Sequence, residues 1–148
     1  MNTLNEYTYD ELISAETDRE HCTRAEFKAE VTEAMMKDFL AICGDINTMH
    51  VDSEFAKGNG FKDRIVYGML TSTFYSTLAG VYLPGKYCLL QGVDSEFHNP
   101  VFIGDQLTIS GYVKEKNDSV RQVIIKAEIR NQDDKKVSKA TIKLGCLR

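Results

Sequence analysis

The 148-residue sequence has no block of basic residues and no apolar leader at its N-terminus. Lys and Arg total 18 against 22 Asp and Glu, a formal net charge of −4. Duplex nucleic acid is therefore not an expected partner. A secretory signal begins with basic residues followed by an apolar stretch, and the first residues lack that pattern. We therefore expect a protein that stays in the cytoplasm.

Metal-binding and nucleophile motifs are also missing. The four cysteines are widely spaced, without a C-x-x-C pair, and are interpreted as small apolar residues: Cys22, Cys43, Cys88 and Cys146. No H-E-x-x-H, G-x-S-x-G or P-loop occurs. Asp45-x-Asn47 resembles the start of a calcium loop, but Met49, His50 and Ala56 stand where that loop needs other residues. The sequence therefore predicts no metal site.

Length and composition indicate one globular domain. Hydrophobic residues make up 43% and charged residues 27% of the chain, both near the averages of folded proteins. At roughly 150 residues per domain, residues 1–148 form a single domain. Residues 1–26 carry alternating charges and few apolar side chains, so we expect a loosely packed lead-in there.

A stretch of 21 residues from Ile65 to Gly85 contains no charge. Its length matches a membrane span, but five Ser and Thr side chains with Gly68, Gly80 and Pro84 make it too polar for lipid. Its apolar residues recur at helical spacing and extend nearly all round. The pattern therefore predicts a helix buried inside its own domain, which Pro84-Gly85 stops, and no membrane partner.

Around this stretch the pattern predicts one more helix and several strands. Helical spacing after Thr32 predicts a helix over residues 33–43 that ends before Gly44. Period-two alternation predicts a short strand from Phe27, a strand over residues 87–97, and three strands after residue 106 joined by short polar turns. The expected fold class is α+β, an antiparallel sheet wrapped around a central helix.

The segment directly after Gly44 holds the first candidate site. Asp45, Asn47 and His50 lie within one short loop, where an acid and a histidine can share the activation of a single water. The alternative is structural: Asp45 and Asn47 form Asx-turns that cap the helix end, and His50 is a satisfied, half-buried residue. A Cys43–His50 nucleophile pair is disfavoured, because Cys43 falls on the apolar side of its helix.

The second candidate lies where the uncharged helix begins, at Tyr67-Gly68. The first N–H groups of a helix have no internal partner and carry the positive end of its dipole, so Gly68 can form an oxyanion hole. The alternative is a small residue in a tight turn. Nearby Lys57, Lys62 and Arg64 are possible phosphate contacts, or simply solvated charges.

These motifs together resemble the MaoC-like dehydratases and R-specific enoyl-CoA hydratases of the hotdog superfamily. The resemblance covers roughly residues 27–147 and rests on five pieces in the same order: a helix, then Gly44-Asp45-Ile-Asn47-Thr-Met-His50-Val-Asp52, Gly60-Phe61-Lys-Asp-Arg64-Ile-Val-Tyr67-Gly68-Met-Leu70, Leu83-Pro84-Gly85, and Phe97 with Asn99-Pro100-Val-Phe-Ile-Gly104-Asp105. It implies a hotdog fold and a homodimer with its sites near the interface.

The resemblance also implies roles for individual residues. The catalytic Asp and His of the family's D-x-N-P-x-H fall on Asp45 and His50, and its Asn on Asn47. The glycine whose N–H polarises the thioester carbonyl falls on Gly68, and an assisting serine falls on Ser76. Two positions depart from the family: Thr48 replaces a usual Pro, and Tyr67 replaces a usual His beside the carbonyl site.

The implied reaction is reversible hydration of a trans-2-enoyl thioester to a 3-hydroxyacyl thioester, carried on coenzyme A or an acyl carrier protein. Asp45 and His50 would hold the water and Gly68 the thioester oxygen, with no metal or organic cofactor. Two alternatives stay open. One is a thioesterase of the same fold, with Asp45 activating water against the carbonyl carbon; the other is a non-catalytic acyl-thioester binding module, in which Tyr67 blocks the productive geometry.

Overall fold

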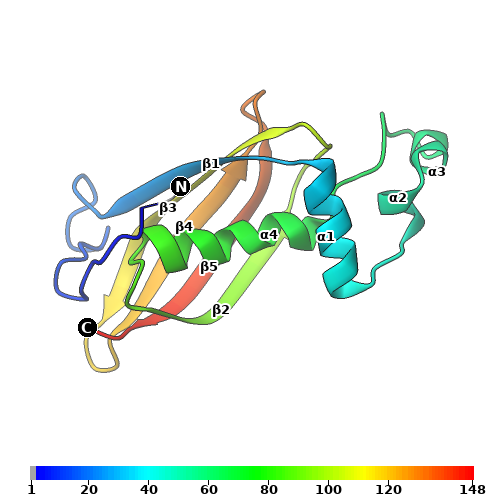
Figure 1. Ribbon diagram of the computed structural model, residues 1–148. Coiled ribbons are helices and arrows are strands. Elements are labelled where there is room, and N and C mark those ends of the chain that lie inside the picture. The colour runs from blue at the N-terminus through cyan, green and yellow to red at the C-terminus, as the bar shows by residue number, and fades with distance from the viewer. Residues whose placement is uncertain (1–2) are drawn as a thin grey trace.

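The computed structural model describes residues 3–148, and its central feature is a five-stranded antiparallel sheet curled around a helix (Figure 1). The strand order is β1-β3-β4-β5-β2. The strands are β1 (Arg24–Glu30), β2 (Cys88–Phe97), β3 (Gln106–Asn117), β4 (Gln122–Arg130) and β5 (Lys136–Cys146). The enclosed helix is α4 (Gly68–Thr77). This arrangement confirms the predicted α+β class.

Alternating residues of β3, β4 and β5 form the core, as the period-two pattern predicts. On β3, Leu107, Ile109 and Val113 are buried against the helix, while Thr108, Ser110 and Tyr112 face outward. β3, β4 and β5 pair in sequence as a meander. β2 does not extend that order, because it pairs with β5 at the far edge, and β1 pairs with β3 at the other.

The uncharged stretch forms two kinds of helix. α4 is followed directly by a π-helical turn, η1 (Leu78–Tyr82). Tyr75 and Leu78 are completely buried, but Met69 is 64% exposed. The prediction of burial nearly all round is therefore wrong for α4, because the sheet covers one side of the helix and leaves the other open.

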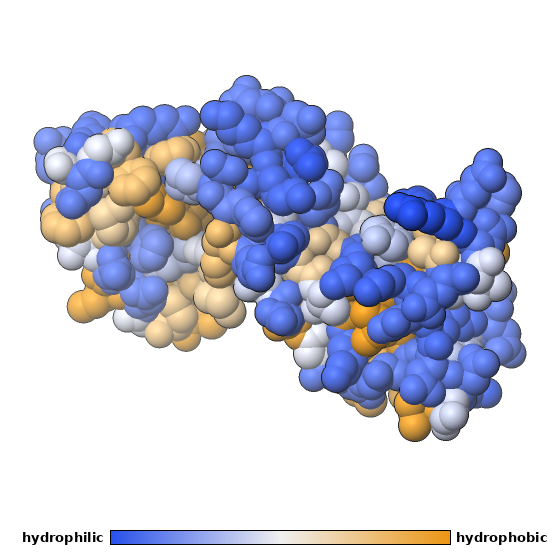
Figure 2. Space-filling view, turned by 180° about the vertical axis from the view of Figure 1, so that it is seen from behind, coloured by the Kyte–Doolittle hydropathy of each residue, from blue (hydrophilic) through white to orange (hydrophobic). Residues whose placement is uncertain are grey.

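Three short helices form a lobe beyond the end of the sheet (Figure 1). They are α1 (Glu33–Cys43), α2 (Thr48–Val51) and α3 (Ser53–Gly58). The hydroxyl of Thr32 accepts the N–H of Met35 at the start of α1, and Gly44 ends it in the left-handed conformation with φ 68°. The predicted helix over residues 33–43 is thus confirmed. Seen from behind, apolar surface gathers over this lobe (Figure 2).

The N-terminal segment packs more closely than the sequence suggests. Tyr9, Leu12 and Cys22 are buried, and the Tyr9 hydroxyl donates to the Asp118 carboxylate at 2.6 Å. The expectation of a loosely packed lead-in is therefore wrong for the residues described here, and residues 1–2 of that prediction lie outside them. Tyr9 and Leu12 of this segment join the core, whereas Leu4 and Ile13 are exposed, and composition alone does not reveal which of them pack.

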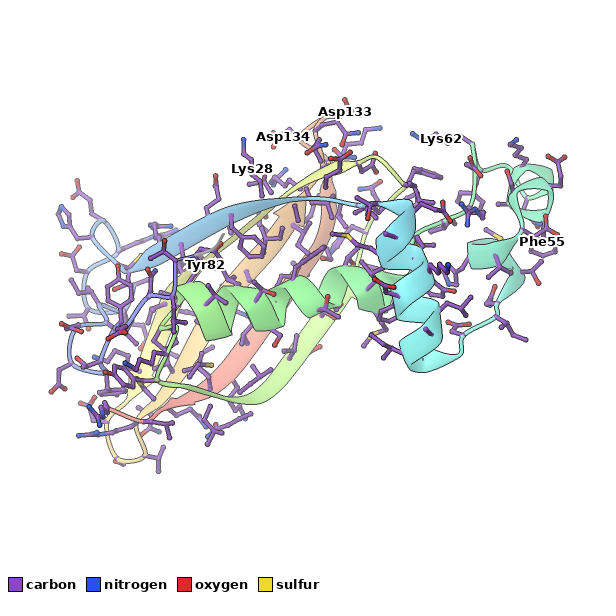
Figure 3. All side chains as sticks on the ribbon, in the orientation of Figure 1. Lys28, Phe55, Lys62, Tyr82, Asp133 and Asp134 are labelled. Carbon is purple, nitrogen blue, oxygen red and sulfur yellow. The ribbon has the colours of Figure 1, made fainter. Side chains whose placement is uncertain are left out.

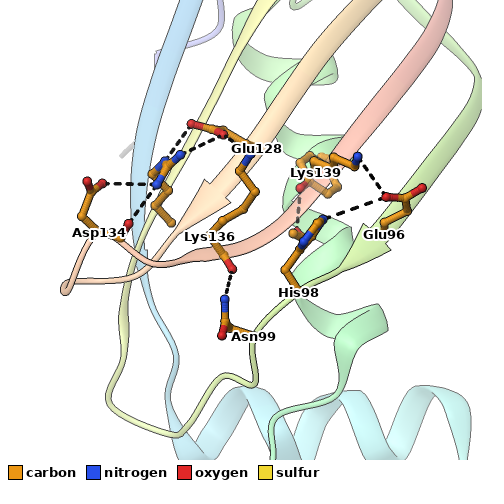
Figure 4. A network of polar contacts seen from close by, with 10 residues as sticks. Glu96, His98, Asn99, Glu128, Asp134, Lys136 and Lys139 are labelled. Atoms are coloured by element: carbon orange, nitrogen blue, oxygen red, sulfur yellow. Dashed lines mark hydrogen bonds and ion pairs between the residues drawn. The ribbon is translucent and has the colours of Figure 1, made fainter.

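The outer face of the sheet carries charged side chains that pair with one another. Glu128 contacts Arg130 at 2.9 Å and Lys136 at 3.5 Å, and Glu96 contacts Lys139 at 3.1 Å (Figure 4). A broad depression of about 1140 Å³ on this face is lined by basic and acidic side chains in equal number: Arg24, Lys114, Lys126 and Lys139 with Glu26, Asp94, Glu96 and Glu128. That balance selects neither anions nor cations. No helix within residues 3–148 is long and apolar enough to cross a bilayer.

Candidate active site

The loop after α1 is shaped by two short side chains. One carboxylate oxygen of Asp45 accepts the N–H of Asn47 at 3.0 Å, and the Asn47 side-chain oxygen accepts the N–H of Met49 at 3.0 Å, capping α2. These are the Asx-turns of the structural alternative. They use only Oδ1 of Asp45, and Oδ2 has no hydrogen-bond partner within residues 3–148. The side chain is exposed, so the turns orient the carboxylate and leave it available.

His50 lies half-buried on α2, with one ring nitrogen occupied. Its Nδ1 is 2.7 Å from the carbonyl oxygen of Ile65. A carbonyl oxygen only accepts, so Nδ1 carries the proton, and Nε2 is the nitrogen that can accept in the neutral form of the ring. The N–H of Ile65 in turn donates to the carbonyl of Met49. This double link fixes α2 beside the segment that leads into α4.

Tyr67 lies between the loop and the helix and is only 2% exposed. Its ring contacts His50, with centroids 4.2 Å apart, and Phe39 of α1, with centroids 5.0 Å apart. Its hydroxyl donates to the main-chain carbonyl of Asp45 at 2.8 Å. Burial raises the pKa of Tyr67, and the nearby Asp45 carboxylate raises it further, so the hydroxyl stays a protonated donor at neutral pH.

Gly68 is the first residue of α4, and no side chain caps this helix end. Its N–H therefore has no acceptor among the described residues and points out at the positive end of the helix dipole. A Cβ at this position would come 3.0 Å from the Phe97 ring. The glycine thus lets β2 approach the start of α4 closely, next to the unpaired N–H.

The remaining predicted residues are not all gathered at this point. Ser76 is exposed and follows Gly68 by eight residues, which is about 12 Å along a helix, so its hydroxyl lies away from the loop. Arg64 is held by Glu33, with nitrogen–oxygen distances of 2.6 and 3.2 Å. Lys57 pairs with Glu54 at 3.7 Å.

Lys62 is the freest of the three basic candidates. It lies on the lobe at the segment after α3 (Figure 3), with its amino group 4.5 Å from the centre of the Phe102 ring. It forms no ion pair within residues 3–148. The structure thus leaves Lys62 open to an anion, whereas Arg64 and Lys57 already have carboxylate partners.

Two groups at this site have no clear signal in the sequence. The Ile65 carbonyl that sets the His50 proton is a main-chain atom, so no residue type marks it. The sequence places Phe97 at the end of a strand and in the last piece of the family resemblance, but its contact with Gly68 depends on β2 lying at the edge next to α4.

The sequence model of a family described as "MaoC like domain" matches residues 15–137 of this chain. The chain belongs to the MaoC-like family. Among solved structures, R-hydratase PhaJ1 from Pseudomonas aeruginosa superposes with a TM-score of 0.85 at 28% identity, covering 97% of this chain and 87% of that one. The (R)-hydratase of Aeromonas caviae gives a TM-score of 0.80 at 27% identity, covering 84% and 94%. The hotdog fold implied by the sequence motifs is therefore confirmed.

Curated relatives match shorter stretches of the chain. An (R)-specific enoyl-CoA hydratase of Aeromonas caviae is 41% identical over 70 residues, which are 47% of this chain and 52% of that protein. A mitochondrial 3-hydroxyacyl-[acyl-carrier-protein] dehydratase of Arabidopsis thaliana is 33% identical over 72 residues, 49% and 42% of the two chains. The chain spans about half the length of these relatives.

In this MaoC-like domain, Tyr67 contacts the main chain of Asp45 and the ring of His50, and it directly precedes Gly68. Asp45 supplies an open carboxylate oxygen, His50 a bare Nε2, and Gly68 an unpaired N–H. A general base, its partner and an oxyanion donor are the parts that addition of water next to a carbonyl requires.

Proposed function

We propose that the protein hydrates trans-2-enoyl thioesters to (R)-3-hydroxyacyl thioesters, and catalyses the reverse dehydration. The observation that carries this proposal is the meeting of the Asp45 loop, the His50 ring and the start of α4 around Tyr67. The relatives named as hydratases and dehydratases support the same reaction. The carbon–oxygen lyase class follows from it.

In the proposed step, Asp45 and His50 hold one water between them. Asp45 or His50 takes a proton from the water while the water oxygen bonds to C3 of the enoyl chain. The C2–C3 π electrons move toward the thioester carbonyl, and the Gly68 N–H stabilises the charge on its oxygen. A proton from the pair then reaches C2 on the same face. The sum is addition of one water, without a metal or organic cofactor.

The test follows the loss of enoyl absorbance from trans-2-enoyl thioesters of several chain lengths. We expect turnover by the wild type and at least a hundredfold loss of kcat in Asp45→Asn and in His50→Ala, because each removes one half of the acid/base pair. Asp52→Asn and His98→Ala are the matched controls. They change an acid and a histidine outside the pair, and both should keep wild-type turnover within about twofold.

Other results would contradict the proposal in distinguishable ways. Release of free thiol from a saturated acyl-CoA would identify a thioesterase. Saturable binding of the enoyl thioester without turnover, with coenzyme A and with acyl carrier protein as the carrier, would identify a binding module. Equal turnover by wild type and both site variants would remove Asp45 and His50 from the mechanism.

The carrier of the acyl group is coenzyme A or acyl carrier protein, and Lys62 is the residue we propose for its phosphate. Its amino group lies on the exposed lobe near Phe102 without a carboxylate partner. Lys57 and Arg64 are weaker candidates for this role because Glu54 and Glu33 already neutralise them. We also propose a reducing, cytoplasmic compartment; its support is the wide spacing of the four cysteines, all of them free.

We further propose that two copies associate through β2. This strand forms hydrogen bonds with β5 on one side only, so its other edge is open. Leu90, Val93 and Phe97 are exposed along it, and Met69 is exposed on the neighbouring start of α4. A two-fold pairing of this edge would cover these apolar side chains and place an interface next to Gly68.

A further inference from the structure

One side chain contacts both members of the proposed catalytic pair, and its residue directly precedes the proposed oxyanion residue in the chain. The hydroxyl of Tyr67 bonds to the main chain of Asp45 at 2.8 Å, and its ring lies 4.2 Å from the His50 ring. Its own peptide unit leads directly into Gly68. Three groups from two separate segments therefore share a single buried neighbour.

Asp45 depends on this contact more than its other bonds suggest. Its N–H lies 3.4 Å from Cys43 Sγ, and its carboxylate accepts the N–H of Asn47. Both partners are two residues away, so neither fixes the loop against the rest of the fold. Within the described residues, the Tyr67 hydroxyl is the one hydrogen-bond partner that ties Asp45 to a distant segment.

The orientation of the His50 ring also depends on Tyr67. Its bond to the Ile65 carbonyl holds Nδ1 but leaves the ring free to rotate about that contact. The Tyr67 ring closes one face of the imidazole, tilted by 34° to it, and Phe39 supports Tyr67 from the opposite segment at 5.0 Å. The stack thereby limits where Nε2 can point.

We propose that Tyr67 is a positioning residue that sets Asp45 and His50 against the Gly68 N–H. This inference rests on the proposed hydration, in which those three groups act on one substrate. The phenol does not touch the reacting atoms, since its hydroxyl is occupied by the Asp45 carbonyl. It acts by holding the pair at a fixed place relative to the helix end, and a displacement of about 1 Å can cost about a hundredfold in rate.

The decisive variant is Tyr67→Phe, which keeps the ring stack and removes the bond to Asp45. Tyr9→Phe is its matched control. Tyr9 is also buried, and its hydroxyl also makes one long-range bond, to Asp118 at 2.6 Å, but it lies in the N-terminal segment away from the loop. Both substitutions remove one tyrosine hydrogen bond from a buried ring, and only one of them touches the site.

We expect Tyr67→Phe to lower kcat by about ten- to hundredfold, with KM for the enoyl thioester within about twofold of wild type. Tyr9→Phe should lower the melting temperature to a similar degree and leave kcat unchanged. If Tyr67 had a purely structural role, Tyr67→Phe and Tyr9→Phe would change kcat and the melting temperature to the same extent. Wild-type kcat in Tyr67→Phe, or an equal loss in Tyr9→Phe, would overturn the proposal while leaving the hydratase function in place.

A second measurement uses the wild-type protein, so it does not depend on whether a Tyr67 variant folds. In the wild-type protein, the Tyr67 ring should shift the NMR signals of the His50 ring protons upfield by its ring current. His21 and His98 have no aromatic ring stacked on them among the described residues and serve as references, with His50→Gln for assignment. Unshifted His50 signals would overturn the proposal even if the wild type hydrates enoyl thioesters. Absence of any turnover by the wild type would instead overturn the proposed function.

Discussion

Asn47 connects the local chemistry of a single side chain with the placement of His50. Its side-chain oxygen accepts the N–H of Met49 and starts α2, the one-turn helix that carries His50. Loss of such a cap costs about 1 kcal/mol. Because α2 has only four residues, loss of the cap destabilises the entire helix.

We predict that Asn47→Ala lowers kcat/KM by about tenfold, because α2 loses its cap and His50 its fixed position. Asn47→Asp keeps an oxygen at the same place and should retain most of the activity. Asp52→Ala is the control: Asp52 caps α3 in the same way, through the Phe55 N–H at 3.1 Å, and α3 carries none of the proposed pair. Steady-state kinetics and thermal melts of the three variants check this, and equal losses in Asn47→Ala and Asp52→Ala would contradict it.

The sequence identifies which residues of this loop are chemically able to act, but not what holds them. Asp45, Asn47 and His50 are recognisable by type and spacing. Their restraints come from the Ile65 carbonyl and from Tyr67, which lie 15 and 22 residues away from their partners. Contacts over such separations depend on the whole fold, so local patterns do not predict them.

At the scale of elements, the closest approach of helix and sheet depends on Gly111 in β3. A Cβ there would lie 2.8 Å from a methyl carbon of Leu78 and 3.1 Å from one of Ile125. Leu78 and Ile125 are fully buried, so neither can move aside. The glycine therefore sets how deeply η1 lies in the sheet.

We predict that Gly111→Ala destabilises the protein by about 1–3 kcal/mol through overpacking. For a chain of this length, each kcal/mol lowers the melting temperature by about 2–4 °C. Gly80→Ala is the control, because a Cβ at Gly80 meets nothing within 4 Å. Thermal or denaturant unfolding measures both, and an unchanged melting temperature in Gly111→Ala would show that the core has room to adjust.

The elements themselves follow well from the sequence, whereas their arrangement follows only in part. Alternation in β3, β4 and β5 and the cap residues of α1 predict those elements because burial and capping act locally. The place of β2 beside β5 and the burial of Tyr9 do not follow, since both depend on which surfaces remain open once the other strands are paired. The sequence does not predict the exposed side of α4 for the same reason.

At the scale of the whole molecule, the open edge of β2 predicts the state of association. We expect the wild type to sediment at twice the mass of one chain. Val93→Lys should shift it to the mass of one chain, because a charge on the apolar edge opposes strand pairing. Val120→Lys is the control, since Val120 is also an exposed valine, 64% against 39% for Val93, but lies in the turn between β3 and β4.

Sedimentation velocity over a range of protein concentrations distinguishes the outcomes. A wild type at the mass of one chain would remove the proposed pairing. A Val93→Lys variant that keeps the wild-type mass would move the contact to another surface. If Val120→Lys also sedimented at the mass of one chain, the result would indicate a general effect of added charge.

The C-terminus lies on the half of the molecule remote from α2 and α3 (Figure 1). There the N–H of Tyr9 donates to the carbonyl of Arg148, so the N-terminal segment is held beside the last residue. This arrangement suits immobilisation: a chain anchored to a bead or an electrode through its C-terminus presents the lobe with Asp45 and His50 to the surrounding solution.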